Sequence, residues 1–171
     1  MPDSDNRSSR YDDIILDIRR YVDDAESIFR RKERFDQDQR DFYARTMVLF
    51  AMSNRLIDLA KETCLTRRYI TEDESIKNKV YFKRLHDYSV IAWEMRQEMI
   101  NLVNFRNQVS HHFYLVTRDD IEYVYSNLPM YLDFVTIMEK EHERAELLTK
   151  RTILIGVALV TLILILLWFF S

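Results

Sequence analysis

Residues 11–34 read YDDIILDIRRYVDDAESIFRRKER, and this stretch indicates how the chain folds. Its apolar residues return every three or four positions, while mostly aspartate and arginine residues occupy the positions between them. Side chains spaced in this way lie on one face of an α-helix, so the stretch predicts an amphipathic helix with one buried face. That face consists of Ile14, Ile15, Ile18, Val22, Ala25, Ile28 and Phe29.

The same periodicity recurs later in the chain. Residues 38–63 and roughly 88–112 each carry an apolar stripe, and another helix is expected from about 119, broken or kinked at Pro129. One glycine and two prolines among 171 residues are too few for the tight turns that a sheet needs. The sequence therefore predicts an all-α fold, an up-and-down bundle of about four or five helices over residues 11–149.

The charge balance and the cysteine count indicate which partners the protein can attract and which compartment it suits. The chain has 25 basic and 28 acidic residues and a net charge of −3, so any contact with RNA would have to be local. Cys64 is the single cysteine, which rules out an intrachain disulfide and fits a reducing compartment. Residues 1–10 are polar, do not resemble a signal peptide, and are expected to form a disordered tail.

The last segment, residues 150–171, differs from the rest. From Thr152 to Phe170 it holds 19 uncharged residues, and a helix of that length is about 28 Å long. The hydrocarbon core of a bilayer is roughly 30 Å thick, and Trp168 would lie at its far interface. A buried core helix would show a polar stripe, which this segment lacks. We expect a single-pass membrane anchor in contact with lipid, with the bundle in the cytoplasm.

A second short stretch, FRNQVSHHFY at residues 105–114, combines an arginine, an asparagine and two histidines. An imidazole can take and return a proton near neutral pH, and a guanidinium can hold a phosphate and stabilise developing charge. Asn107 can orient either the imidazole or the substrate. Arg106, Asn107 and His111 are therefore the candidate catalytic residues for attack of an RNA 2′-hydroxyl on the neighbouring phosphate, without a metal or cofactor.

The spacing of these residues leaves two alternatives open. Arg106 and His111 are five positions apart, about 140° around a helix axis, so one straight helix would not aim both at one atom. A cleft between two helices, or between two copies of the chain, could collect them. The structural alternative is that the histidines contact the last carbonyls of a helix while Arg106 pairs with a surface acid. No glycine-rich phosphate loop or cysteine cluster is present, and no metal site is predicted.

FRNQVSHHFY resembles the signature of the HEPN superfamily, in which an arginine and a polar residue precede a histidine by four to six positions. The wider pattern is similar to the HepT-like branch, Arg-Asn-x-x-x-His-x-Tyr between a Leu/Phe-rich approach and a Leu-Pro step. Arg106, Asn107 and His111 match this pattern, as do LVNF at 102–105 and NLPMYL at 127–132.

The resemblance covers residues from about 11 to 140 and carries several expectations. It implies a helical homodimer whose signature residues line one shared cleft, and metal-independent cleavage of RNA. It also implies a nucleotidyltransferase antitoxin as partner, which can AMPylate the motif tyrosine. Here Phe113 occupies that tyrosine's position, so Tyr114 is the candidate modification site. His112 also falls within the family's spacing window and is the auxiliary candidate, although the spacing from Asn107 favours His111.

Two functions follow as hypotheses. The first is a membrane-tethered HEPN-type endoribonuclease that acts on cytoplasmic RNA in a toxin–antitoxin or phage-defence setting, with histidine as general acid and base. The alternative is a non-catalytic dimeric HEPN adaptor that recruits a partner to the membrane.

Overall fold

The computed structural model describes residues 4–30, 39–71 and 76–170, and within these ranges the chain contains helices and no strand. The all-α prediction is confirmed, with six α-helices rather than four or five because the short helices α3 and α5 are separate elements. The elements are α1 (Ser4–Phe29), α2 (Gln39–Thr66), α3 (Asn78–Asp87), α4 (Trp93–His111), the 3-10 helix η2 (Phe113–Leu115), α5 (Arg118–Ser126) and α6 (Leu128–Phe170).

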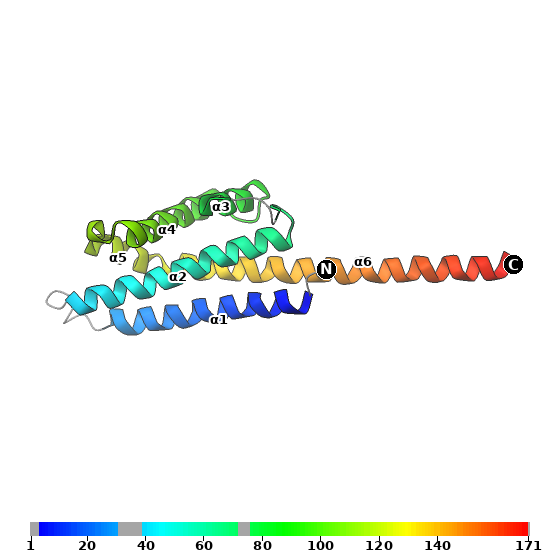
Figure 1. Cartoon of the computed structure of the whole chain (residues 1–171), viewed down its shortest axis with the longest axis horizontal. Coiled ribbons are helices and arrows are strands. Elements are labelled where there is room, and N and C mark those ends of the chain that lie inside the picture. Colours follow the sequence, from blue (N-terminus) through cyan, green and yellow to red (C-terminus); the bar gives the residue numbers. More distant parts are fainter. Residues whose placement is uncertain (1–3, 31–38, 72–75, 171) are drawn as a thin grey trace.

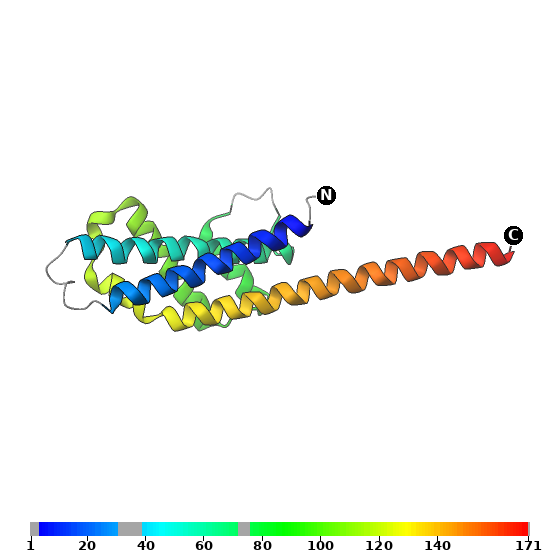
Figure 2. The same cartoon turned by 90° about the horizontal axis from the view of Figure 1, so that it is seen from below.

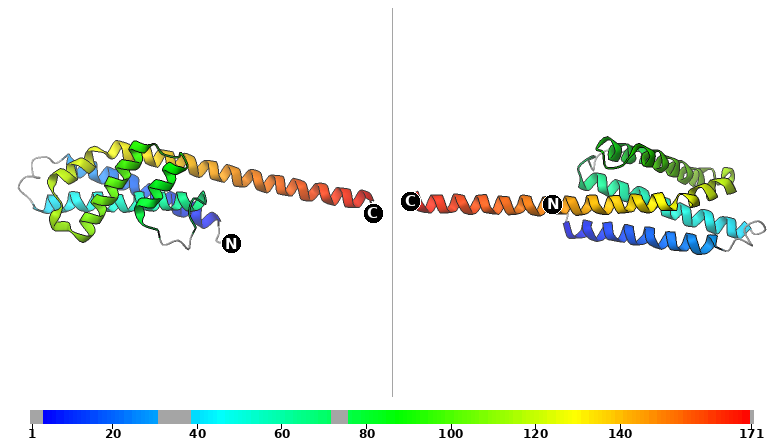
Figure 3. Two further views of the ribbon diagram at one scale, coloured as in Figure 1. Left: turned by 90° about the horizontal axis from the view of Figure 1, so that it is seen from above. Right: turned by 180° about the vertical axis from the view of Figure 1, so that it is seen from behind.

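α2 is the central helix of the bundle, and the predicted apolar face of α1 packs against it. Ile18 and Ala25 of α1 are completely buried, as are Leu49 and Leu56 of α2. α2 also contacts α3, α4, α5 and α6. Figures 1 and 2 show α1, α2 and the first part of α6 side by side, and the left view of Figure 3 shows α3 and α4 crossing over α2. Each isoleucine or leucine side chain buried in this way stabilises the fold by about 1.5–3 kcal/mol.

Two helix boundaries differ from the predicted ones. α1 begins at Ser4, within the tail expected to be disordered, because no glycine or proline separates Ser4 from the apolar stripe. Residues 1–3 lie outside the described part of the chain. α4 begins at Trp93 rather than near 88, because Ser89 adopts a left-handed conformation (φ 58°) that ends α3.

The break expected at Pro129 is confirmed at the junction between α5 and α6. α5 ends at Ser126 and α6 begins at Leu128, which places Pro129 in the first turn of α6. Backbone N–H groups in that turn have no partner within the helix, so the missing N–H of proline costs little there. α5 begins with a capping box, in which Thr117 and Asp120 exchange hydrogen bonds.

α6 is 43 residues long and extends beyond the other helices (Figures 1 and 3). Thr152 and Trp168, two residues of the expected anchor, are exposed. Among the residues that the structure describes, no helix is long and apolar enough to cross a membrane, so the structure does not support the transmembrane prediction. Several side chains of the expected anchor, including that of Phe170, lie outside the described residues.

Candidate functional site

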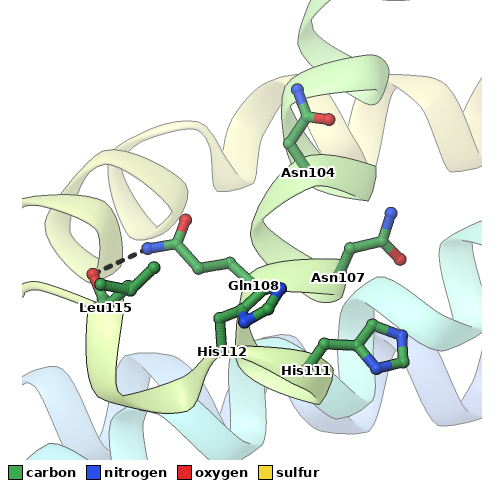
Figure 4. A pocket seen from close by; sticks show the side chains of 6 residues that line it. All are labelled: Asn104, Asn107, Gln108, His111, His112 and Leu115. Atoms are coloured by element: carbon green, nitrogen blue, oxygen red, sulfur yellow. Dashed lines mark hydrogen bonds between the residues drawn. The ribbon is translucent and has the colours of Figure 1, made fainter.

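The stretch FRNQVSHHFY forms the end of α4 and the turn that leads toward α5. α4 runs to His111, and His112 leaves the helical conformation with φ −141° and ψ 46°. Residues 113–115 then form the single turn of η2. The side-chain amide of Gln108 donates a hydrogen bond of 2.8 Å to the carbonyl of Leu115, which ties this turn back to α4 (Figure 4).

Phe113 anchors the turn on the first part of α2. Its ring stacks on Tyr43 with 5.2 Å between centroids, and its edge meets Phe42 at 6.1 Å. Because Phe113 faces α2, the residues on either side of it turn outward, and Tyr114 is 80% exposed. The Tyr114 ring lies 6.2 Å from that of His112, in an edge-on arrangement.

A surface pocket of about 570 Å³ lies beside the turn. Asn107 and His111 project to the same side of α4, as their spacing of four positions predicts, whereas Gln108 turns toward Leu115 (Figure 4). The structure therefore brings together three of the predicted residues at one pocket. The pocket is lined by Asn104, Asn107, Gln108, His111, His112 and Leu115.

Arg106 does not line this pocket, because it lies on a neighbouring face of α4 that packs against α2. Its Nε donates a hydrogen bond of 2.8 Å to Oδ1 of Asn54, and its guanidinium lies over the ring of Phe50 at 5.8 Å. One terminal nitrogen of Arg106 also donates to Oδ1 of Asn107 at 3.4 Å. Arg106 is thus linked to the pocket through Asn107 rather than placed within it.

Hydrogen bonds of Glu98, in the first half of α4, hold this helix in place. Glu98 is 6% exposed, and its carboxylate accepts hydrogen bonds from the hydroxyls of Tyr131 on α6, at 2.6 Å, and Tyr123 on α5. Burial and the bond to Glu98 both raise the pKa of Tyr131, so its hydroxyl remains a donor near neutral pH. The helix that carries the site is therefore fixed to two others.

The two imidazoles remain open to solvent. Among the residues that the structure describes, no side chain forms a hydrogen bond with the ring of His111 or His112, and both residues are exposed. No group of three His, Cys, Asp or Glu side chains within the described ranges could hold a metal ion. Cys64 is buried, and burial raises the pKa of its thiol to about 12, so it is not a reactive nucleophile.

Sequence patterns do not reveal Asn54, Phe50 or Gln108 as parts of this site. Asn54 lies 52 positions before Arg106, and only the packing of α2 against α4 brings them together. Gln108 lies within the signature stretch, but its role depends on the conformation of the following turn.

The fold and the site together define a helical bundle with an Arg-Asn-His constellation at the end of its fourth helix. Residues 18–138, more than half of the chain, match the family described as Ribonuclease HepT-like. The chain belongs to this family. The matched region begins within α1, contains all of the signature stretch, and ends within α6.

Solved structures with the same fold include two toxin–antitoxin complexes. One was determined with AMP-PNP; it shares 16% identity and a TM-score of 0.67 over 75% of this chain and 96% of that one. The other is a tri-AMPylated Shewanella oneidensis HEPN toxin with MNT antitoxin, with 16% identity and a TM-score of 0.67 over 76% and 96% of the respective chains. At this identity the likeness shows the fold alone. No curated protein matches the chain.

Proposed function

We propose that this protein is a HEPN-type endoribonuclease that acts as the toxin of a toxin–antitoxin pair or in phage defence. The observation that carries the proposal is the pocket at the end of α4, where Asn107 and His111 share one wall and Arg106 donates a hydrogen bond to Asn107. Membership of the Ribonuclease HepT-like family supports the same activity.

In the proposed reaction, His111 accepts the proton of an RNA 2′-hydroxyl as the 2′-oxygen attacks the adjacent phosphorus. The bond from phosphorus to the 5′-oxygen breaks, and a protonated imidazole, for which His112 is the auxiliary candidate, donates a proton to that oxygen. The products are a 2′,3′-cyclic phosphate and a 5′-hydroxyl. Arg106 stabilises the charge that develops on the phosphate oxygens, and this scheme needs no metal or cofactor.

The active form in this proposal is a homodimer. Arg106 and the pocket residues face different directions from one α4, so a second copy placed over the pocket would complete the set around a bound RNA strand. The exposed apolar side chains of Tyr114 and Leu115 beside the pocket offer contact area for that copy or for the bases of RNA.

Regulation by a nucleotidyltransferase antitoxin is the second part of the proposal. Tyr114 is the most exposed tyrosine next to the pocket, so its hydroxyl is accessible to a modifying enzyme. An adenylyl group on that hydroxyl would bring a negatively charged phosphate beside His112 and occupy space that RNA needs.

Attachment to a membrane through residues 152–170 is the third part. It rests on the uncharged sequence of that segment and on the exposure of its described apolar side chains. The basic residues before the segment favour a cytoplasmic location for the bundle.

The experiment that tests the proposed activity is cleavage of single-stranded RNA by the purified full chain in the presence of EDTA. We expect 2′,3′-cyclic phosphate ends, and His111→Ala should lower kcat/KM by about 10²–10⁴-fold because a general base is lost. The folding and the thermal stability of His111→Ala are compared with those of the wild type and of Asn104→Ala, a substitution on the same helix. If the wild type leaves RNA intact, or His111→Ala cleaves at the wild-type rate, the non-catalytic adaptor becomes the better interpretation.

A further inference from the structure

We infer that Asn54 on α2 is a positioning residue, which holds the guanidinium of Arg106 in a fixed orientation for a phosphate group of the substrate. The inference rests on the proposed ribonuclease activity and adds a residue from outside the signature stretch. The contact that carries it is the 2.8 Å hydrogen bond from Nε of Arg106 to Oδ1 of Asn54.

The orientation of the Asn54 amide is set by its own helix. Its Nδ2 donates a hydrogen bond of 3.0 Å to the carbonyl oxygen of Phe50, one turn earlier in α2. The reversed amide would place its NH2 group against the N–H of Arg106 and its oxygen against the oxygen of Phe50. Two repulsive contacts would replace two hydrogen bonds, so Oδ1 must face Arg106.

The ring of Phe50 gives the guanidinium a second contact on α2. Phe50 and Asn54 are four positions apart on one face of α2, and both are half-buried beneath Arg106. The guanidinium lies 5.8 Å from the centroid of the Phe50 ring, so its charge interacts with an aromatic face instead of a carboxylate. These contacts restrict the rotation of a side chain that otherwise has several flexible bonds.

Arg106 differs in its partners from the arginines of the bundle that pair with carboxylates. Most ion pairs in the described residues join an arginine to a carboxylate, as for Arg19 with Glu139 and Arg55 with Asp17. Arg106 forms no ion pair with a carboxylate of the described ranges, and its side-chain oxygen partners are the neutral amides of Asn54 and Asn107. Neutral acceptors orient the guanidinium while leaving its positive charge uncompensated, which suits it to bind an anion.

The remaining N–H groups of Arg106 can bind a phosphodiester. Of the five N–H donors of a guanidinium, one is taken by Asn54 and one by Asn107, so the others can form two parallel hydrogen bonds. Paired donors of this kind match two oxygens of a phosphodiester. The structure thus assigns Asn54 the task of aiming this pair of donors.

The test compares two substitutions of Asn54 in the full chain. Asn54→Leu removes the acceptor at similar volume, whereas Asn54→Asp keeps an oxygen for Arg106 but loses the hydrogen bond to Phe50. With an RNA oligonucleotide, we expect Asn54→Leu to lower kcat by about 10- to 100-fold at a nearly unchanged KM, because the charge remains but its direction is lost. Asn54→Asp should keep most of kcat and raise KM, because its charge competes with phosphate for Arg106.

A matched control and a second measurement separate positioning from stability. Asn101→Leu removes a comparable amide contact between helices, the 3.2 Å bond to the hydroxyl of Tyr123, and should leave kcat unchanged. In NMR spectra, the Nε–H signal of Arg106, assigned with Arg106→Lys, should exchange faster with water in Asn54→Leu. It should keep its protection in Asn54→Asp and in Asn101→Leu.

The outcomes distinguish this inference from the proposed function. A kcat of Asn54→Leu equal to that of the wild type would overturn the positioning role. An equal loss of kcat in Asn101→Leu, with the two variants melting at the same temperature, would overturn it too. If the Nε–H hydrogen of Arg106 exchanges with water at the wild-type rate in Asn54→Leu, the positioning role is overturned as well. If the wild-type chain cleaves no RNA, the proposed function fails, and the NMR comparison alone decides whether Asn54 holds Arg106.

Discussion

At the scale of single residues, packing explains why a phenylalanine suits the position two residues after His111. The position two residues after His111 faces α2, where a ring packs between Tyr43 and Phe42. A phenolic hydroxyl there would point toward this aromatic cluster, whereas Phe113 needs no hydrogen-bond partner. The next residue, Tyr114, is turned to solvent beside His112.

Tyr114 is therefore the residue to examine for modification. When the chain is incubated with ATP and a nucleotidyltransferase antitoxin encoded beside it, we expect AMP on Tyr114 and loss of RNA cleavage. Mass spectrometry of peptides locates the adenylyl group. Tyr114→Phe should stay unmodified and active, whereas Tyr88→Phe, which alters another exposed tyrosine, should be modified normally. Modification that persists in Tyr114→Phe would rule this assignment out.

At the scale of elements, the positions of the site residues depend on the contacts that hold α4. Glu98 connects α4 to α5 through Tyr123 and to α6 through Tyr131. Gln108 and Phe113 connect the end of α4 to the following turn and to α2. Hydrogen bonds to a charged and buried acceptor are stronger than neutral ones, so the Glu98 contacts fix the helix on which the signature lies.

Replacement of Glu98 tests this connection. Glu98→Leu should lower the free energy of unfolding by about 2–4 kcal/mol, since the buried Tyr131 hydroxyl loses its acceptor while the more exposed Tyr123 can turn to water. Urea denaturation measures the change. The double variant with Tyr131→Phe should recover part of the loss, because no buried donor then lacks an acceptor. If the two substitutions are simply additive, the hydrogen bond between them contributes nothing.

At the scale of the whole molecule, the candidate site and the projecting part of α6 lie at opposite ends of the bundle. α5 and the end of α4 lie at one end, and α6 leaves the other helices at the far end (Figures 1 and 3). If the apolar C-terminal segment attaches to a membrane, the pocket at the end of α4 faces away from the lipid. RNA and an antitoxin could then reach it from the cytoplasm.

Membrane attachment can be measured by flotation of the full chain with phosphatidylcholine vesicles. The wild type should rise with the vesicles, whereas the combined change of Leu159→Arg and Ile163→Arg should leave it in the aqueous fraction, since charges in hydrocarbon are costly. Leu16→Arg, which alters another exposed leucine, on α1, should float like the wild type. Equal flotation of all three proteins would contradict attachment through this segment.

The amino-acid sequence by itself determined the all-α fold. The apolar stripe of residues 11–29 and the break at Pro129 are local patterns, and both agree with the structure. The spacing of Asn107 and His111 also predicted correctly that they share a face. Helix periodicity relates only residues on neighbouring turns, so it can predict helices, their ends and shared faces.

Only the tertiary structure decided where Arg106 points and what supports it. Asn54 and Phe50 become its neighbours because α2 and α4 pack together, and their distance along the chain leaves no periodic signal. The outward position of Tyr114 likewise depends on Phe113 finding an aromatic surface on α2. Contacts of this kind depend on how whole helices pack against each other. The shapes of the side chains buried in the core determine that packing.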